Sequence, residues 1–405
     1  MWTSQFGVPL INGAVCSFAA PEGLYCAGYA SGSLPDQTGA GAVDAFLRRY
    51  DPDEGRVMWT KQFGTATEDG VAAVCVDPSG VYVAGCTDGV LPGQTSAGGY
   101  DAFLRKYDSS GTEVWTSQFG GADNDFAKGV CADCGGVYVV GDIERLGLDP
   151  ENPDWPEYDA FVTKYDADGN EVWMKELASP DLWNQAWAVC AHSSGVYVAG
   201  EAHLDAFLTK YDGSGTELWS SQLDFSFEDS AYGVAADEGG VYVTGGTWGY
   251  DAFLRKYSHT GTVLWTRLFG AGVGTYTAGK SVCCDPTGVY VCGATNGALP
   301  GQTSAGGEDG FVRKYDADGT ELWTYQFGTG RYDAIYGICA GSLFVGGGMD
   351  RVESQDQATP EASDAFVGKV HPGGPTLAAP FADRRTREWL DWLDALFNPW
   401  QRRLR

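Results

Sequence analysis

Short runs in which apolar and polar residues alternate recur along the chain, and Asp101 to Gly120 (DAFLRKYDSSGTEVWTSQFG) is a typical one. In an extended strand, successive side chains point to opposite faces. Phe103 and Tyr107 then share one face, while Ala102 and Leu104 share the other. Because both faces carry apolar residues, we expect these strands to be buried on both sides, as in sheets stacked face to face.

Both halves of this stretch occur seven times. Neighbouring copies of its Trp are 46 to 58 residues apart, a period typical of propellers and solenoids. The Asp-Ala-Phe half begins at Asp44, Asp101, Asp159, Asp205, Asp251, Asp309 (as Asp-Gly-Phe) and Asp364. The other half centres on Trp2, Trp59, Trp115, Trp173, Trp219, Trp265 and Trp323.

Each period holds four predicted strands, rich in the aromatic and β-branched residues that favour strands. In one period they are Gly70–Asp77, Val81–Gly85, Asp101–Asp108 and Thr112–Phe119. Gly-containing turns such as Asp108-Ser109-Ser110-Gly111 separate them, since Gly accepts a left-handed backbone. The pattern therefore predicts four-stranded antiparallel sheets.

The two ends of the repeat region complete each other. The chain opens with a lone fourth strand, Trp2 to Phe6, and residues near 334–341, 343–347 and 364–370 supply only the first three strands of the last period. Joined, these pieces form a seventh blade and close the ring, which removes exposed strand edges. We therefore predict that residues 1–370 form an all-β, seven-bladed β-propeller, in which the N-terminal strand joins the last blade.

The motifs G-V-Y-V-x-G, D-A-F-x-x-K-Y-D and G-x-E-x-W-x-x-Q-F-G resemble those of the bacterial beta-propeller repeat (SBBP) family over about residues 1–370. The resemblance implies a propeller that takes part in interactions and supplies no catalytic residues. Members of that family are commonly exported or surface proteins.

After Val370 the composition changes. Residues 371–380 (HPGGPTLAAP) form a predicted Pro/Gly linker, and residues 381–405 have the apolar spacing of an amphipathic helix. This tail either folds back on the acidic propeller or docks to a partner protein. A membrane-interface anchor ranks third, because Asp391 and Asp394 interrupt the basic character that such helices prefer. The predicted docking residues are Trp389, Leu390, Trp392, Leu393, Leu396, Phe397 and Trp400.

The formal net charge of −28 argues against nucleic acid as a partner, because an acidic surface repels phosphates. No apolar run is long enough to span a bilayer, and the first residues, MWTSQFGVPL, do not form a signal peptide.

The 11 cysteines are an odd number, and four of them hold one place in the repeat (Cys75, Cys131, Cys190 and Cys283). Because that place recurs on adjacent blades, we expect the thiols to stand too far apart for disulfides. Reduced thiols favour a cytoplasmic location, with the cell surface or secretion as the alternative that the resemblance implies.

Loops of uneven length should gather on one face of the ring, and acids lie just before the first strands there. Asp69, Asp125, Asp229 and Asp333, with Asn184 in register, either gather a cation or a basic partner at the channel mouth or accept hydrogen bonds from turn amides. No metal site with recognisable ligand spacing is present in the sequence. We therefore predict no cofactor, with a cation at the channel mouth as the functional alternative.

Four Trp residues fall outside the repeat and the tail: Trp155, Trp183, Trp187 and Trp248. With Tyr250 they are predicted on or near the loop face, where they either stack on a glycan or protein or pack under the loops. The four His residues are scattered, and no nucleophile elbow, P-loop or HExxH motif occurs. We therefore expect a non-catalytic protein-interaction or scaffold subunit. The alternative is a carbohydrate-binding or glycan-active propeller that uses the aromatic loop face.

Overall fold

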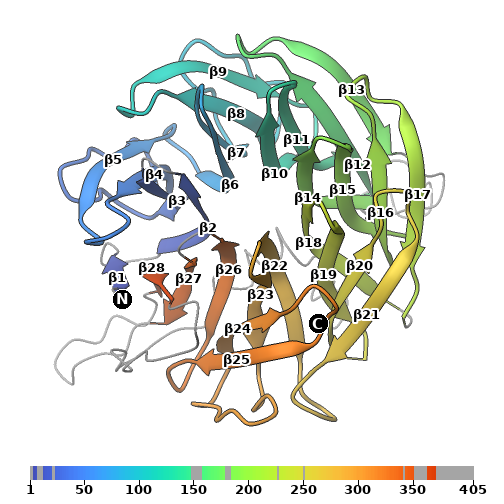
Figure 1. The fold of residues 1–405 in the computed structure, drawn as a ribbon. Helices are drawn as coiled ribbons and strands as arrows, with labels where there is room; N and C mark the ends of the chain where they lie inside the picture. The colour runs from blue at the N-terminus through green and yellow to red at the C-terminus, as the bar shows by residue number, and fades with distance from the viewer. Residues whose placement is uncertain are drawn as a thin grey trace, which may run out of the picture.

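The computed structural model describes residues 3–6, 12–20, 23–146, 157–177, 184–225, 228–249, 251–340, 343–350 and 363–370. These residues form seven four-stranded antiparallel sheets arranged as blades around a central axis (Figure 1). The predicted seven-bladed β-propeller is confirmed. We number the blades in chain order from the sheet that begins with the second strand.

The first strand of each blade lies nearest the axis, and the second strand pairs with it (Figure 1). The innermost strands are β2 (Asn12–Ala20), β6 (Asp69–Asp77), β10 (Asp125–Asp133), β14 (Asn184–His192), β18 (Asp229–Asp237), β22 (Thr277–Asp285) and β26 (Asp333–Cys339). The second strands are β3 (Gly23–Ala30), β7 (Gly80–Thr87), β11 (Gly136–Arg145), β15 (Gly195–Ala202), β19 (Gly240–Thr247), β23 (Gly288–Thr295) and β27 (Phe344–Asp350).

The third strand carries the Asp-Ala-Phe motif, and the fourth, with the repeated Trp motif, forms the rim. The third strands are β4 (Asp44–Tyr50), β8 (Asp101–Tyr107), β12 (Glu157–Tyr165), β16 (Asp205–Tyr211), β20 (Ala252–Tyr257), β24 (Asp309–Tyr315) and β28 (Ser363–Lys369). The fourth strands are β5 (Val57–Phe63), β9 (Glu113–Phe119), β13 (Glu171–Leu177), β17 (Glu217–Leu223), β21 (Val263–Phe269), β25 (Glu321–Phe327) and β1 (Thr3–Phe6).

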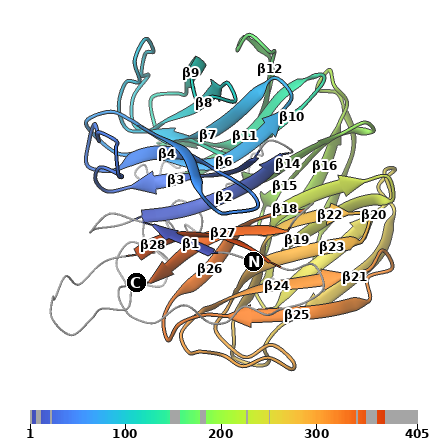
Figure 2. The ribbon, with the colours of Figure 1, turned by 60° about the vertical axis from the view of Figure 1, so that its left-hand side comes forward.

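The N-terminal strand closes the ring as the sequence predicts. β1 pairs antiparallel with β28, from Thr3 opposite Gly368 to Phe6 opposite Ala365, and completes the seventh blade (Figure 2). The Phe6 ring then meets Phe46 of the first blade edge-on, with centroids 5.6 Å apart. Two segments from opposite ends of the repeat region therefore share one blade and pack on the next.

The hydrophobic core lies between the blades. Every residue of β8 is buried, as expected for a strand with two apolar faces. Phe103 meets Phe63 of the preceding blade with ring centroids 5.9 Å apart, and Phe119 meets Phe161 of the following blade at 5.8 Å. Among the described residues, the same aromatic contact occurs at five of the blade interfaces.

A second repeated contact joins the blades at the rim. The indole N–H of Trp115 and the ammonium of Lys106 both donate to the carbonyl oxygen of Ala167, in a turn of the next blade, at 3.1 and 3.3 Å. Trp265 and Lys256 donate in the same way to Ala317, at 3.1 and 3.2 Å. We call this contact the rim clamp. It explains why the repeat keeps a cation on the third strand and a Trp on the fourth, directly opposite each other in the sheet.

The predicted linker (371–380) and helix (381–405), with all seven predicted docking residues, lie outside the described residues. Within the part of the chain that the structure describes, no helix is long and apolar enough to cross a membrane.

Candidate interaction surface: the loop face and the channel wall

Two sets of loops share one face of the ring, as the sequence predicts. These loops join the second strand to the third within a blade, and the fourth strand to the first strand of the next blade. The amide of Asp88 donates to the carbonyl of Glu68 at 2.9 Å, and the amide of Asp125 donates to that of Tyr100 at 2.6 Å. We call this side of the ring the loop face.

Three insertions on this face share the sequence LPxQTxAG and are built alike: Leu34 to Gly41, Leu91 to Gly98 and Leu299 to Gly306. In one of them, the amide of Leu91 donates to the Gln118 side-chain oxygen at 2.9 Å, and the Gln94 side chain accepts from the Gln118 amide at 3.0 Å. The Gln118 side chain then donates to Asp101 at 2.7 Å. Gln62 and Gln326 make the corresponding bonds in the other two. These insertions therefore use their polar motif to fix their own position on the blade.

The four acids predicted at the channel mouth lie on separate blades and do not converge. All four side chains are buried. Each accepts a hydrogen bond from the backbone N–H four residues earlier, with distances of 2.5 to 2.6 Å. This is the turn-capping arrangement that the sequence offered as the structural alternative to cation binding. The four are Asp69, Asp125, Asp229 and Asp333.

Each of these acids is also close to the acid that opens the third strand of the preceding blade. At Gly120, an added Cβ would overlap with carboxylate oxygens of both Asp101 and Asp125. The corresponding glycines, Gly64 and Gly328, lie in the same way against two acids. The glycine of the Q-F-G motif is thus required because two buried carboxylates approach the backbone there.

The Asp101–Asp125 pair differs from the Asp44–Asp69 pair in the residue that stands opposite its inner acid. Thr87 donates to Asp69 at 2.5 Å from the neighbouring strand, whereas the residue opposite Asp125 is Ile143, which offers no side-chain donor. The Oδ1 atoms of Asp101 and Asp125 have no hydrogen-bond partner among the described residues. Burial, followed by the charge of Asp101, raises the pKa of Asp125 to about 7.

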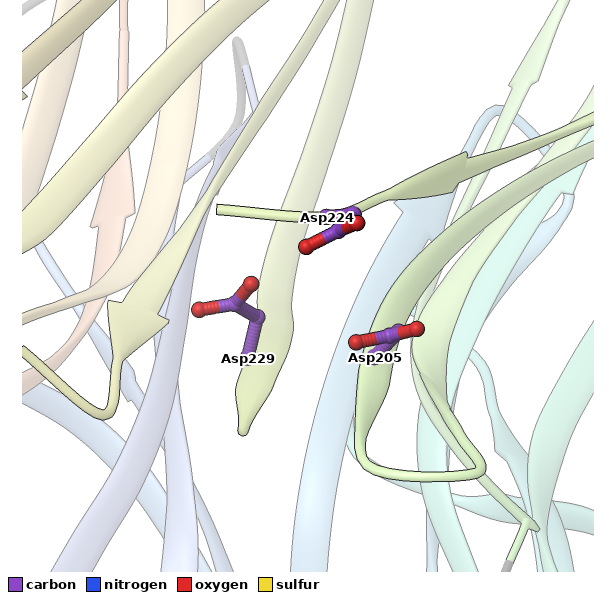
Figure 3. A group of neighbouring side chains, drawn as sticks. All are labelled: Asp205, Asp224 and Asp229. Atoms are coloured by element: carbon purple, nitrogen blue, oxygen red, sulfur yellow. The ribbon is translucent and has the colours of Figure 1, made fainter. Parts of the chain in front are cut away.

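A third acid joins one of these pairs. Asp205, Asp224 and Asp229 face one another where blades 4 and 5 meet, and their ligand oxygens all lie within 4.8 Å (Figure 3). Burial, followed by the charges of Asp224 and Asp229, raises the pKa of Asp205. Of the four predicted acids, Asp229 is the one that stands in such a group among the described residues, and three carboxylates suit a hard cation.

The channel wall carries a feature that the sequence analysis missed. Every innermost strand has a β-bulge at one position, in the middle of the strand, so that one extra residue stands unpaired there. We call this set the bulge ring. Its members differ in chemistry from blade to blade: Val15, Ala72, Lys128, Trp187, Tyr232, Lys280 and Tyr336.

Four members of the bulge ring contact one another across consecutive blades. The Lys128 ammonium lies 3.7 Å from the centre of the Trp187 ring, and that ring meets Tyr232 edge-on at 5.6 Å. On the other side, the Lys280 ammonium lies 4.3 Å from the centre of the Tyr232 ring. Two cations therefore flank two aromatic rings on the wall, in the order cation, ring, ring, cation.

Lys128 is also held by a buried acid. Its ammonium forms an ion pair with Asp142 of β11, and both side chains are almost fully buried. Burial raises the pKa of Asp142 to about 6, against the pull of the Lys128 charge. Burial likewise lowers the pKa of Lys128, against the pull of Asp142. The pair is the most strongly desolvated ion pair among the described residues.

The predicted aromatic residues divide among three settings. Trp248 lies on the loop face with 47% of its surface exposed. Trp187, by contrast, is buried in the channel wall, where its neighbours are Lys128 and Tyr232. Trp155, Trp183 and Tyr250 lie outside the described residues.

Two histidines that are 67 positions apart in sequence meet on the side of the ring opposite the loop face. The rings of His192 and His259 stack with centroids 4.8 Å apart. The Tyr197 hydroxyl bonds to one nitrogen of His259 at 2.8 Å, and the other nitrogen lies 2.9 Å from the carbonyl of Asp237. Burial lowers the pKa of His259. The bond to Tyr197 therefore links blade 4 to blade 5, and the bond to Asp237 fixes the His259 ring within blade 5.

The fold and its loop face define the chain as a seven-bladed β-propeller. Among solved structures, it is similar to the WD40 domain of Neurospora crassa Pan2, with a TM-score of 0.51 and 10% identity over 95% of this chain and 98% of that one. The WD40 propeller of Doa1 gives a TM-score of 0.51 and 13% identity over 91% and 95%. At these identities, the similarity establishes the fold.

Sequence comparison adds one partial relative. The chain is 32% identical over 111 residues to the regulatory protein FlaEY of Caulobacter vibrioides. The match covers 25% of this chain and 11% of FlaEY, so the chain spans about a tenth of that relative. No protein-family model matches the chain.

Proposed function

We propose that this protein is a non-catalytic scaffold that binds a partner protein on its loop face and at the adjoining channel wall. The observation that carries the proposal is the bulge ring: one structural position holds five different residue types across the seven blades. A purely architectural position would repeat, as the rim clamp does. Rigid scaffolds bind through such non-repeating surfaces.

The similarity to WD40 propellers supports this proposal, because domains of that type typically act as protein-interaction scaffolds. We further propose that residues 381–405 dock as a helix, that the repeats are of the SBBP type, and that the protein acts in the cytoplasm. The net charge of −28 favours a partner with a basic patch.

Affinity capture with the full-length chain tests the proposal. We compare the wild type with Trp248→Ala and Lys280→Ala, which alter the loop face and the channel wall. The control is Leu218→Ala, which removes an equally exposed apolar side chain from the rim strand β17. Stoichiometric retention of one partner, weakened at least tenfold by the first two variants and unchanged by the control, is expected. Equal retention by all four proteins would contradict the proposal.

Two further measurements separate the alternatives. Deleting residues 376–405 should abolish capture without lowering the melting temperature if the tail docks in trans, and lower the melting temperature without altering capture if it packs on the propeller. Glycan-array binding that is lost in Trp248→Ala, without a protein partner, would instead favour the carbohydrate-binding function.

A further inference from the structure

The two stacked histidines both replace the residue that other blades carry at the same place. His192 opens the turn between the first and second strands of blade 4, where four other blades have aspartate: Asp77, Asp133, Asp237 and Asp285. His259 lies in the hairpin between the third and fourth strands of blade 5, where four other blades have a small residue: Ser109, Ala167, Gly213 and Ala317. The two rings are parallel to within 6° and their centroids are 4.8 Å apart. Two departures from the repeat on neighbouring blades therefore meet in one contact.

The partners of His192 determine which ring nitrogen carries its proton. The Ser194 amide donates to Nδ1 of His192 at 3.2 Å, as the Ser79 amide donates to the Asp77 carboxylate at 2.7 Å in blade 2. Because an amide can only donate, Nδ1 accepts, and the proton of neutral His192 lies on Nε2. Histidine therefore performs the task of the turn aspartate only while its ring is neutral.

The partners of His259 select the same neutral form. Its Nε2 lies 2.9 Å from the carbonyl oxygen of Asp237, which can only accept, so Nε2 carries the proton. Nδ1 then accepts from the Tyr197 hydroxyl at 2.8 Å. The Ser194 hydroxyl lies 2.9 Å from Nδ1 of His192 and 3.0 Å from Nδ1 of His259. Both Nδ1 atoms therefore act as acceptors and face groups that donate.

The charges around the two rings oppose a further proton. A positive charge on either ring would stand against the face of the other, and the Lys210 ammonium bonds to the carbonyl of His259 itself at 2.8 Å. Two carboxylates act in the opposite sense. One is that of Asp237, and the other is that of Glu238, whose side chain is 96% exposed and lies 3.8 Å from Nε2 of His192. Burial, with the charges of His192 and Lys210, nevertheless lowers the pKa of His259.

His259 is also the acceptor of a rim clamp. Its carbonyl receives the Trp219 indole N–H at 3.1 Å and the Lys210 ammonium at 2.8 Å, both from blade 4. In the clamps of Trp115 and Trp265 the acceptor residue is alanine, whose side chain does not titrate. The side chain that would take up the proton thus belongs to the residue that holds blade 4 onto blade 5.

We propose that His192 and His259 form an acid-sensitive latch between blades 4 and 5. Near neutral pH both rings are uncharged, and they join the blades through their stacking and the hydrogen bonds of Ser194 and Tyr197. When the pH falls below about 6, Nδ1 of one ring takes up a proton, which then faces donors instead of accepting from them. The charged ring is repelled by Lys210 and by any charge on the other ring, so it leaves the stack and the interface loosens.

The latch makes the folded state less stable as the solution becomes more acidic. Histidines of the unfolded chain take up protons near their ordinary pKa of about 6.5, whereas the folded pKa of His259 lies lower. The contribution of the latch to stability is therefore present above about pH 6.5 and is lost as the pH falls through the folded pKa. Between pH 7 and pH 5, the unfolding equilibrium constant should rise roughly fivefold more in the wild type than in a chain without the latch.

Urea denaturation of the full-length chain at pH 5, 6, 7 and 8 tests the latch with the double variant His192→Asn/His259→Ala. Asparagine keeps an acceptor for the turn amide, and alanine is what blades 3 and 6 carry at the place of His259. This variant should lose the additional fivefold change. The control is His203→Asn, which removes an exposed histidine from blade 4 at a left-handed position that asparagine tolerates. The control should retain at least the wild-type change.

A second variant reverses the charge beside His259. His192→Asp restores the residue that the repeat uses in this turn, and its carboxylate favours a protonated His259. In NMR titrations of histidine-labelled protein, His259 should take up its proton at a pH about one unit higher in this variant than in the wild type. This measurement is made on folded protein, so it tests the latch even if the double variant does not fold.

Three results would overturn the proposal. The first is the same pH dependence of unfolding in the wild type and the double variant. The second is a wild-type His259 that takes up its proton at or above the ordinary histidine pKa. The third is a titration of His259 that His192→Asp leaves unchanged.

Discussion

The rim and the channel wall of this propeller are built from the same repeat, yet they differ in how they use it. At the rim, five successive blade interfaces share one clamp, in which an indole N–H and a cation converge on one carbonyl of the next blade. At the wall, the bulge position carries lysine, tryptophan, tyrosine or alanine, depending on the blade. The rim therefore maintains the ring, and the wall gives each blade its own chemistry.

The physical reason for this difference is whether the side chain must find a fixed hydrogen-bond partner. A rim Trp has to place its N–H on an acceptor, and at these five interfaces the next blade offers the same turn carbonyl. A bulge residue stands outside the ladder of strand hydrogen bonds and has no fixed partner. Its neighbours are the bulge residues of the adjacent blades, as the contact between Lys128 and Trp187 shows. Variation is therefore tolerated at the wall and penalised at the rim.

The largest effect is expected at the wall. Lys128→Met removes the cation that faces Asp142 and leaves a buried carboxylate without a counter-charge. We expect a loss of about 3–5 kcal/mol in the free energy of unfolding at pH 8, measured by urea denaturation. The loss should shrink at pH 5, because Asp142, whose pKa is already raised to about 6, would then carry a proton.

The double variant Lys128→Met/Asp142→Leu separates charge from packing. It should recover most of the lost stability, since it removes both charges and keeps the site filled. If Lys128→Met alone is as stable as the wild type, the Lys128–Asp142 ion pair does not stabilise the channel wall. The matched variant Lys280→Met should cost much less, because Lys280 is less buried and lies against Tyr232.

A smaller and uniform effect is expected at the rim. Trp115→Ala and Trp265→Ala remove the same clamp from two different interfaces, with acceptor distances of 3.1 Å in both. We expect each to lower the free energy of unfolding by about 2–3 kcal/mol, through lost ring packing and a lost hydrogen bond. The control is Trp248→Ala, which changes an exposed Trp on the loop face and should leave the free energy of unfolding almost unchanged. All three variants are measured by urea denaturation. Losses at Trp115 and Trp265 that differ by more than twofold would mean that the clamp is not equivalent from blade to blade.

The sequence predicted the rim well and the wall poorly, for the same reason. Period-two alternation and the return of Asp-Ala-Phe and Trp motifs define strands, blade count and ring closure, because these residues satisfy identical contacts in every blade. Apolar alternation and repeated motifs do not reveal the bulge, because the bulge adds one residue without altering the apolar pattern around it. One signal was available: the residue three positions after Asp125 or Asp229 changes character between repeats, from Lys128 to Tyr232. The four acids were found by sequence, but only the three-dimensional ring shows that each caps its own turn and that the four do not converge.

The smallest expected effect concerns how the free energy of unfolding depends on pH. Asp125 and Asp69 hold the same place in the repeat but should contribute differently to it. The folded pKa of Asp125 is raised to about 7, so the folded protein keeps a proton that the unfolded chain releases near its ordinary pKa. Its contribution to stability is present at low pH and is lost as pH rises through 7. Between pH 5 and pH 8 this group should cost the wild type roughly 2 kcal/mol of unfolding free energy. Asp125→Asn should remove that slope, because an amide does not titrate.

Asp69→Asn is the comparison. The pKa of Asp69 is also raised by burial, but hydroxyl hydrogen bonds from Thr87 and Thr65 favour its charged form. We therefore expect this variant to change the slope less than Asp125→Asn does, in urea denaturation at pH 5, 6, 7 and 8. Equal changes in slope would show that the residue opposite each acid, Thr87 in one blade and Ile143 in the other, does not control its titration. A steeper effect at Asp125 alone would show that even within the repeated framework a single opposing side chain gives one blade a property that its neighbours lack.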